Sequence, residues 1–513
     1  MRKWHNWRFS FYRCYCYMAI ISTLATFFLF YRKLFHEDNQ WQVYSNSLSN
    51  PSTVRSEDFH EQVKLKTSFW TRHQLSISQR KSKDMHIAPF IESLPHLMQS
   101  QILNINPTIF VPQSLNQNRS PPDLVISIPT TRRMTKNYIY DTIKNLISNL
   151  ADCERWRVLF LIFIAEQETE MQEKYALEIA RYLNEQYPLL LEEGLFEIIG
   201  PPPFFYPPDL NSVIPTFNDS NERMIWRTKQ NLDYSYIMSY SQTVHSRSSY
   251  YLQLEDDVVT VPGYVSKILN FASERDFFTC DFSNLGFIAK LFKIPDLHLF
   301  VTFDLLFYRY KPVDWLLEQF YSTRYCNPEE KNCVKNRINN HHRFYYNPPL
   351  FQHVGRYSSL KGKIQPLREK TFRSSPTQLS EVCRQKEVES QLSTNIVGLM
   401  TSTLNKLVQF GTPVRIENPL DGSFIKINYG SKPLMLTEID IRYAYKLIEP
   451  TTESIFPLSV ELQSDSETWT VNSTVAEYFN IAVEEESSIS EIRVFVSNEV
   501  RFKYFTFTSL RIV

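Results

Sequence analysis

The sequence predicts an α/β domain followed by a smaller β-sandwich, with a membrane-spanning helix ahead of both. At 513 residues the chain is longer than one hydrophobic core usually organises. From residue 123 to about residue 255, apolar strand-like runs alternate with helical patterns, which is typical of a doubly wound α/β domain. After about residue 400, apolar and polar residues alternate in short runs, as in half-buried antiparallel strands. We therefore expect an α/β fold class with a second, all-β part.

The elements of the α/β part can be assigned in chain order. Apolar runs predict strands at residues 124–128, 158–165, 195–199 and 250–254. Helical spacing of apolar residues predicts helices at 137–150, 168–187 and 222–243. The run at 158–165 is almost wholly apolar, which is expected of a parallel strand covered on both faces. Clustered prolines between residues 201 and 208 predict a loop.

The last part of the chain has the period of antiparallel strands. Alternating runs occur at residues 424–428, 438–442, 458–462, 469–471, 492–496 and 505–507. We expect a β-sandwich over residues 401–513. Residues 371–400 match neither pattern and are expected to form a linker.

The amino-terminal region contains a candidate membrane anchor. Residues 14–31 form a charge-free, mostly apolar run that would span about 27 Å as a helix. Four basic residues precede it, so residues 1–13 are expected to stay cytoplasmic and the rest of the chain to be luminal. A cleaved signal peptide is the alternative, but the run is long for a signal core and no clear cleavage site follows. The polar residues 32–90 are expected to form a luminal stem.

Cysteines and glycosylation sequons fit a luminal location. Five cysteines follow the apolar run, and Cys326 and Cys333 bracket a polar loop that a disulfide could close. The odd count leaves at least one unpaired thiol or an intermolecular bond. No second close pair of Cys or His has zinc-ligand spacing, which disfavours zinc. N-glycosylation sequons begin at Asn118, Asn218 and Asn472.

The net charge limits the classes of partner. Lys and Arg number 55 and so do Asp and Glu, so no global positive field indicates a nucleic-acid partner. The hydrophobic content of 43% is that of a globular protein. A site for a charged ligand must therefore be local.

Three consecutive carboxylates, Glu255, Asp256 and Asp257, follow directly on the strand predicted at 250–254. Short acidic patterns arise by chance, but open α/β sheets bind ligands at the carboxyl ends of their strands. Carboxylates there suit a Mg²⁺- or Mn²⁺-type ion that binds a nucleoside diphosphate. The alternative is a solvated acidic turn, in which three adjacent carboxylates would repel one another without a cation.

Several segments on both sides of the acidic run resemble one family. They are IPTTRR at 128–133, RTKQNLDY at 227–234, YLQLEDD at 251–257, FSNLGFI at 282–288, PVDWLL at 312–317 and FQHVG at 351–355. Together they are similar to the N-acetylglucosaminyltransferase IV family, the α-1,3-mannosyl-glycoprotein 4-β-N-acetylglucosaminyltransferases. The resemblance implies a glycosyltransferase A-type (Rossmann-like) catalytic domain at 91–370, a lectin-like sandwich and a single-pass type II protein of the Golgi membrane.

The resemblance also implies a reaction. GlcNAc would move from UDP-GlcNAc to O4 of the α-1,3-arm mannose of N-glycan cores, with inversion and with a divalent metal, usually Mn²⁺. The macromolecular partners would be N-glycans on secretory glycoproteins, and self-association or association with other Golgi glycosyltransferases is left open.

The candidate metal ligands lie in the matched segments. Asp257 is expected to bind the metal directly, and Glu255 and His353 are further candidates. Asp256 is expected to hold the donor ribose or metal-bound water. A lone histidine beside apolar residues is also common as a structural residue, which is the alternative for His353.

An inverting displacement also needs a general base. Asp281 is the candidate, because the stretch at 277–282 is expected to return beside the strand that carries the acidic run; an ordinary strand-end aspartate is the alternative. Polar residues expected near the donor or acceptor are Thr130, Arg132, Arg133, Arg227, Lys229, Asn231 and Asp233. Glu453 aligns loosely with an acidic sugar-binding residue of the family's lectin module.

Three hypotheses for function follow. The first is an active branching transferase. The second is a non-catalytic relative that binds or regulates other glycosyltransferases in the lumen. The third is a metal-dependent glycosyltransferase with another donor or acceptor. The retained acidic run and His353 favour an enzyme.

Overall fold

The computed structural model describes most of the chain from residue 107 onward. The gaps are residues 112–119, 203–204, 328, 330, 334–337, 340, 361, 374–378, 383–389, 421, 431–433, 436–437, 449–456, 465–467, 473–477, 483–487, 497–500 and 513. The predicted anchor and stem, Asn118 and Glu453 therefore lie outside the described residues. In the described part, no helix is long and apolar enough to cross a membrane. The chain divides into two units, Met1–Asp84 and Met85–Val513, and the described residues lie in the second.

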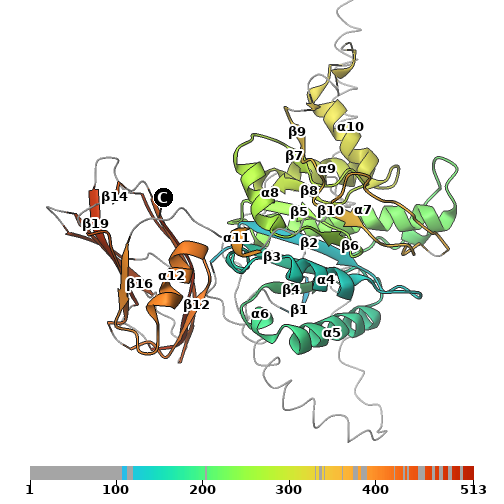
Figure 1. The fold of residues 1–513 in the computed structure, drawn as a ribbon. Coiled ribbons are helices and arrows are strands. Elements are labelled where there is room, and N and C mark those ends of the chain that lie inside the picture. The colour runs from blue at the N-terminus through green and yellow to red at the C-terminus, as the bar shows by residue number, and fades with distance from the viewer. Residues whose placement is uncertain are drawn as a thin grey trace, which may run out of the picture. The chain divides into compact units, whose positions relative to one another are not determined.

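An eight-stranded mixed sheet forms the centre of the α/β part, in the order β1-β4-β3-β2-β5-β8-β7-β9 (Figure 1). Its strands are β1 (Thr108–Val111), β2 (Leu124–Thr130), β3 (Val158–Ile164), β4 (Phe196–Gly200), β5 (Tyr250–Gln253), β7 (Thr279–Asp281), β8 (Lys290–Lys293) and β9 (Arg343–Tyr345). Strands β4, β3, β2 and β5 run parallel, as predicted, and β3 is buried along its whole length. β8 pairs antiparallel with both β5 and β7.

Helices cover both faces of this sheet. The helical segments are α4 (Ile139–Ser148), η3 (Asp152–Glu154), α5 (Thr169–Gln186), α6 (Pro188–Glu192), η4 (Leu210–Ser212), α7 (Asn221–Val244), α8 (Tyr264–Ser273), η5 (Ile294–Asp296), α9 (Leu297–Phe307) and α10 (Val313–Tyr325). Along β2, Leu124 and Ile126 belong to the core with α4, α5, α6 and α8, whereas Val125 belongs to the core with α7, α9 and α10. Because side chains alternate along a strand, one apolar strand supplies both cores, and the doubly wound prediction is confirmed.

A short ribbon lies beyond the main sheet. β6 (Val258–Thr260) follows the acidic run and pairs antiparallel with β10 (Phe351–His353), so that His353 lies opposite Val258. This pairing joins two segments that are almost a hundred residues apart in the sequence. It places the predicted histidine beside the predicted carboxylates.

The carboxyl-terminal part is a β-sandwich, as predicted. One sheet has the order β11-β13-β19-β16-β17 with β14 paired to β19, and the other has the order β12-β20-β15-β18. The elements are β11 (Gln391–Thr394), α12 (Thr401–Phe410), β12 (Val414–Glu417), β13 (Phe424–Asn428), β14 (Leu434–Met435), β15 (Glu438–Leu447), β16 (Leu458–Ser464), β17 (Thr468–Asn472), β18 (Tyr478–Ala482), β19 (Ser488–Val496) and β20 (Phe502–Ile512). The short helix α11 (Leu379–Val382) precedes them in the chain, and its Val382 lies next to Gly263 of the α/β part. Both sheets contribute to one core.

One boundary of the sandwich differs from the expectation. β11 falls within the predicted linker but pairs with β13 as an edge strand of the first sheet. None of its side chains is fully buried. An edge strand of this kind lacks the alternation of buried apolar residues by which strands are found in a sequence.

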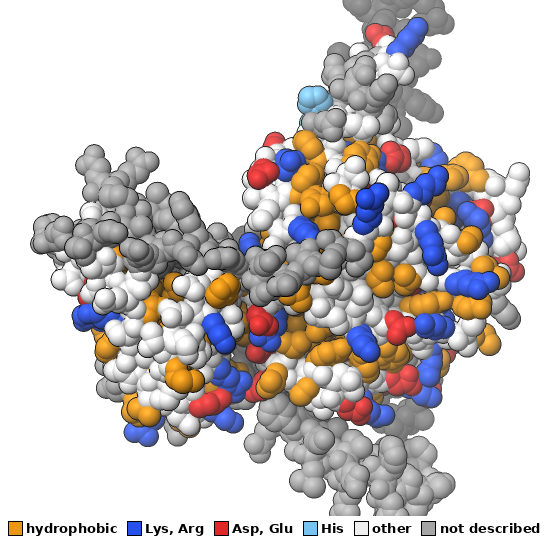
Figure 2. Space-filling model, viewed as in Figure 1, with side chains coloured by type: hydrophobic (Ala, Val, Ile, Leu, Met, Phe, Trp, Pro, Cys, Tyr) orange, Lys and Arg blue, Asp and Glu red, His pale blue; other side chains and the backbone are white. Residues whose placement is uncertain are grey.

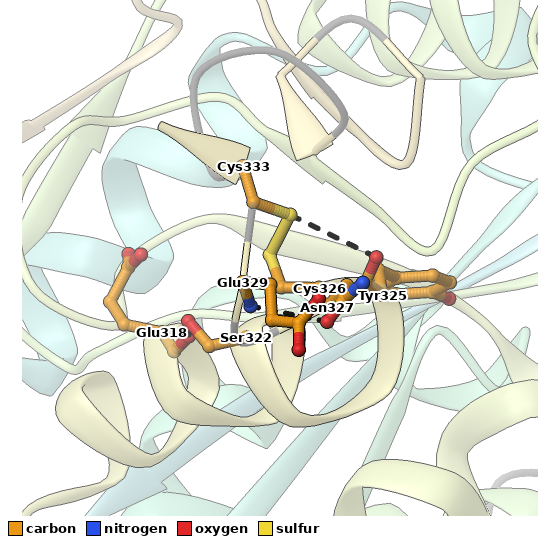
Figure 3. The surroundings of a disulfide bond; sticks show 7 residues. All are labelled: Glu318, Ser322, Tyr325, Cys326, Asn327, Glu329 and Cys333. Carbon is orange, nitrogen blue, oxygen red and sulfur yellow. Dashed lines mark hydrogen bonds between the residues drawn. A yellow bond between two sulfur atoms is a disulfide. The ribbon is translucent and has the colours of Figure 1, made fainter. Parts of the chain in front are cut away.

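The predicted disulfide between Cys326 and Cys333 is present (Figure 3). It closes the loop that follows α10, where Tyr325 is the last helical residue. Cys153 is also disulfide-bonded, whereas Cys280 is a free, buried thiol. Because Cys280 lies in the middle of β7, its thiol is enclosed by the core and burial raises its pKa above the usual range of a thiol.

Candidate active site

The ribbon of β6 and β10 brings Glu255, Asp257 and His353 together. One ligand atom from each of the three side chains lies within 4.8 Å of the others. His353 Nε2 is 3.5 Å from Asp257 Oδ2, and His353 Nδ1 is 3.3 Å from the carbonyl oxygen of Leu367. The contact to Leu367 orients the imidazole so that Nε2 faces the carboxylates, which is a common arrangement around metal-binding histidines.

Gly355 makes the close packing around Asp257 feasible. A Cβ atom at this glycine would lie only 1.9 Å from Asp257 Oδ2. The backbone N–H of Val354 donates a hydrogen bond of 2.9 Å to the Asp257 carbonyl oxygen. The backbone after β10 therefore passes directly against the carboxylate, and only a residue without a side chain fits there.

The carboxylates of the cluster lie close to one another, and Arg133 Nη2, 3.3 Å from Asp257 Oδ2, supplies a positive charge beside them. Burial and the neighbouring Asp257 together raise the pKa of Glu255 to about 8, while His353 opposes the shift. Burial lowers the pKa of His353, but the contact with Asp257 outweighs this effect and the net shift is upward. Asp257 Oδ1 is buried without a hydrogen-bond partner in the part of the chain that the structure describes. Two carboxylates and an imidazole with an unsatisfied oxygen are a donor set that fits a divalent cation such as Mn²⁺.

Asp256 belongs to a second group beside the cluster. Its Oδ2 accepts a hydrogen bond of 2.7 Å from Thr130 Oγ1, and its Oδ1 is 2.5 Å from Arg133 Nη2. The Arg133 side chain is 9% exposed, and its Nε and Nη1 have no hydrogen-bond partner among the described residues. Arg133 Nη2 is also 3.3 Å from Asp257 Oδ2, so the guanidinium is held by two carboxylates. A guanidinium fixed in this way through one nitrogen is suited to a phosphate group.

These residues line one pocket of about 390 Å³. Among the residues predicted near the donor, it includes Thr130, Arg133, Lys229, Asp233, Glu255, Asp256, Asp257 and His353. Lys229 Nζ lies 2.8 Å from Asp233 Oδ2, so these two pocket charges neutralise each other. Over the visible face of the molecule, acidic and basic side chains are interspersed (Figure 2). Binding of an anion therefore depends on the local charges of this pocket.

Three residues predicted near the donor do not line this pocket. Arg132 is exposed and pairs with Glu178 at 3.1 Å. Arg227 is buried and pairs with Asp219 at 2.8 Å. Asn231 donates hydrogen bonds to two backbone carbonyls of the segment after α9. The side chains of these three residues contact neighbouring segments instead of the pocket.

The expectation for Asp281 is corrected by the sheet topology. β7 does not lie beside β5, because β8 is inserted between them. Asp281 is fully buried, with Oδ2 at 2.9 Å from Lys290 Nζ and 2.7 Å from Arg343 Nη2. A carboxylate enclosed by two cations has no access to a substrate hydroxyl, so the geometry does not support a base role for Asp281.

The pocket contains a carboxylate that the sequence reasoning did not select. Asp314, in the first turn of α10, lines the pocket and has no ion pair among the residues that the structure describes. Burial raises its pKa, and hydrogen bonds from backbone N–H groups, including that of Trp315 at 3.0 Å, oppose this. Asp314 belongs to the segment PVDWLL, which resembles the family, but nothing in the spacing of that segment distinguishes Asp314 from an ordinary aspartate at the start of a helix.

The fold and the pocket define a class of protein. A doubly wound α/β sheet carries, at the carboxyl end of β5, a carboxylate–imidazole cluster, a guanidinium with free donors and a separate carboxylate, all lining one pocket. These are the features of a group-transfer enzyme for an anionic, phosphorylated donor.

Comparisons with known proteins identify the family. The model of the MGAT4 conserved region matches residues 85–372. The chain is 37% identical over 394 residues to α-1,3-mannosyl-glycoprotein 4-β-N-acetylglucosaminyltransferase B of Homo sapiens, covering 75% of this chain and 68% of that protein. It is 39% identical over 295 residues to form A of Bos taurus, covering 56% of this chain and 52% of that protein. The chain belongs to the α-1,3-mannosyl-glycoprotein 4-β-N-acetylglucosaminyltransferase family and is a glycosyltransferase.

Part of the chain has a weak likeness to a solved structure. The structure of GH31 CBM32-2 bound to GalNAc matches 25% of this chain and 98% of its own length, at 8% identity and a TM-score of 0.20. A likeness of this size has no bearing on function.

Proposed function

We propose that the chain transfers GlcNAc from UDP-GlcNAc to the α-1,3-arm mannose of N-glycans, in β-1,4 linkage and with inversion at the anomeric carbon. The printed names of its relatives support the reaction. The observation that carries the proposal is that Glu255, Asp257, His353, Arg133 and Asp314 all line one pocket within the family-matched region.

The donor half of the pocket is assigned to the acidic run and Arg133. Glu255, Asp257 and His353 would hold a divalent ion, which we take to be Mn²⁺. When bound, such an ion neutralises the diphosphate and stabilises the charge that develops on the leaving UDP. Arg133 donates its free Nε and Nη1 hydrogens to a phosphate oxygen, while Asp256 and Thr130 keep the guanidinium in place.

Asp314 is assigned as the general base. Its carboxylate takes the proton from the acceptor hydroxyl as the hydroxyl oxygen bonds to the anomeric carbon. The bond from that carbon to the diphosphate oxygen breaks on the opposite face, which inverts the configuration. A pKa raised by burial brings this carboxylate closer to the working pH and makes it a stronger base.

The remaining features of the proposal concern location and architecture. The catalytic part is a glycosyltransferase A-type domain, and the protein is a single-pass type II protein of the Golgi membrane with its folded parts in the lumen. The apolar run at 14–31 with basic residues before it supports this topology. Protease protection of an epitope at the carboxyl terminus in intact Golgi vesicles checks it, and digestion of that epitope would contradict it.

The reaction is tested with the purified full chain, UDP-GlcNAc, Mn²⁺ and a biantennary N-glycan. The expected product carries one additional β-1,4-linked GlcNAc on the α-1,3-arm mannose, identified by mass and linkage analysis. Product formed only with another UDP-sugar, or in another linkage, would refute the proposed specificity. No product with any UDP-sugar would refute the enzyme and favour a binding or regulatory relative.

A further inference from the structure

Two exposed aromatic rings lie at the rim of the pocket. Phe217 and Trp315 contact each other edge to face, with ring centroids 5.6 Å apart. Nevertheless they stay 57% and 47% exposed. Trp315 also lines the pocket and directly follows Asp314 in the chain. We call this pair the aromatic ledge. Its rings are not part of the core, and they form an apolar surface continuous with the pocket.

The turn that carries Phe217 has an unusual backbone. Phe217 and Asn218 both have φ of +58°, in the left-handed region where a side chain is unfavourable. Neither residue is a glycine, and Phe217 is bulky. Backbone strain of this kind persists only where the surrounding contacts enforce it, and it is concentrated at functional sites.

Arg227 supplies the enforcing contacts. Its Nη1 pairs with Asp219 at 2.8 Å, just after the strained residues. Its Nη2 donates to Thr216, just before them, and to the carbonyl oxygen of Tyr310 at 3.1 Å. Its guanidinium carbon lies 5.6 Å from the centre of the Phe217 ring. One buried arginine thus holds both ends of the turn and the ring, and it acts as a positioning residue rather than a donor contact.

We propose that the aromatic ledge binds the acceptor glycan by stacking against the face of a sugar ring, and that Arg227 keeps Phe217 in position for this contact. Sugar rings have an apolar C–H face that packs on aromatic rings while their hydroxyl groups stay in water. The inference rests on the proposed function. It adds an acceptor subsite beside Asp314, so that a stacked ring would present a hydroxyl to the base.

A glycan is favoured over a protein partner because the ledge consists of two rings and continues into a pocket. Protein interfaces of specific complexes bury a much larger area, about 800 Å² on each partner. The chemistry of Asp314 next to Trp315 also requires a hydroxyl-bearing ligand at this position.

The test compares acceptor and donor kinetics of the full chain. Trp315→Ala and Phe217→Gly are the informative variants, since glycine accommodates the positive φ and keeps the turn while removing the ring. We expect the KM for the glycan to rise about tenfold for each variant. The KM for UDP-GlcNAc and its hydrolysis without acceptor should stay within twofold. Trp315→Phe should keep most of the acceptor affinity, and Leu177→Ala, an exposed apolar position on α5, is the matched control.

The role of Arg227 is tested by a double-mutant cycle. Arg227→Gln should raise the glycan KM in the same direction, and combining it with Phe217→Gly should add little, because both changes act through one ring. Additive effects would overturn the positioning role. An unchanged glycan KM in Trp315→Ala and Phe217→Gly would overturn the acceptor subsite while leaving the proposed function intact.

Failure of the proposed function would be recognised separately. If the wild-type chain transfers no sugar, binding of a mannose-terminated N-glycan is measured directly by saturation-transfer NMR. Binding that is lost in Trp315→Ala and kept in Leu177→Ala would sustain the ledge as a glycan site. Absent binding by the wild-type chain, or equal binding by both variants, would overturn it.

Discussion

The roles of Asp281 and Asp314 are separated by changing each to asparagine. Asparagine keeps the shape of the side chain but cannot take up a proton as a carboxylate does. Asp281 is buried between two cations, whereas Asp314 lines the pocket without an ion pair among the described residues. The first substitution should therefore affect stability and the second should affect catalysis.

The magnitudes follow from burial. The Asp281 side chain is 1% exposed, and its partners Lys290 and Arg343 are 2% and 9% exposed. Removing one charge from such a buried network costs about 3–5 kcal/mol. At about 2–4 °C per kcal/mol in larger domains, Tm should fall by roughly 6–20 °C. Asp314→Asn should change stability by less than about 1 kcal/mol and slow transfer by about 10²- to 10⁴-fold.

Both variants are measured by thermal unfolding and by transfer to the glycan at a temperature where each is folded. Binding of UDP in Mn²⁺ serves as the control, because neither variant should change it more than a few-fold. If Asp281→Asn had the Tm of the wild type but no longer transferred GlcNAc, Asp281 would be the general base after all. Full activity of Asp314→Asn would remove Asp314 from the mechanism.

The remaining predictions concern the donor site and pH. Gly355→Ala should greatly weaken UDP binding in the presence of Mn²⁺, because the added Cβ would lie 1.9 Å from Asp257 Oδ2. Normal affinity by calorimetry would show that the close packing of Gly355 on Asp257 is not needed for donor binding. Arg133→Gln should weaken UDP binding by about 1.5–3 kcal/mol, which is the contribution of hydrogen bonds to charged groups. Uridine has no phosphate, so equal weakening of uridine binding would contradict a phosphate contact of Arg133. The pKa of Asp304 is raised to about 7 because the carboxyl group is buried, and the hydrogen bond from Ser235 partly offsets this increase. Its unfolded pKa is about 4, so its contribution to stability is complete below pH 4 and is lost as the pH rises to about 7. Asp304→Asn should therefore raise Tm relative to wild type more at pH 8 than at pH 5, and a pH-independent difference would show that Asp304 does not titrate in this range.

The sequence alone predicts much of the fold. The wholly apolar run of β3 and the alternating runs of the sandwich reflect burial, which acts on each strand separately and leaves a local pattern. The buried strand β8 was missed, since Lys290 and Lys293 at its ends hide its character. Lys290 can be buried there because Asp281 compensates its charge. This ion pair joins two strands, so the sequence of one strand alone does not reveal it.

In the candidate site, too, some features can be predicted from the sequence and others cannot. The sequence by itself determined the acidic run at the end of β5, the match of His353 to the family and the loop closed by Cys326 and Cys333, because each depends on neighbouring residues or a short motif. Only the tertiary structure decided that Asp314, not Asp281, lines the pocket, since β8 separates β7 from β5. It also decided that Arg227 orders the Phe217 turn. Both depend on packing between segments distant in sequence, which leaves no local pattern.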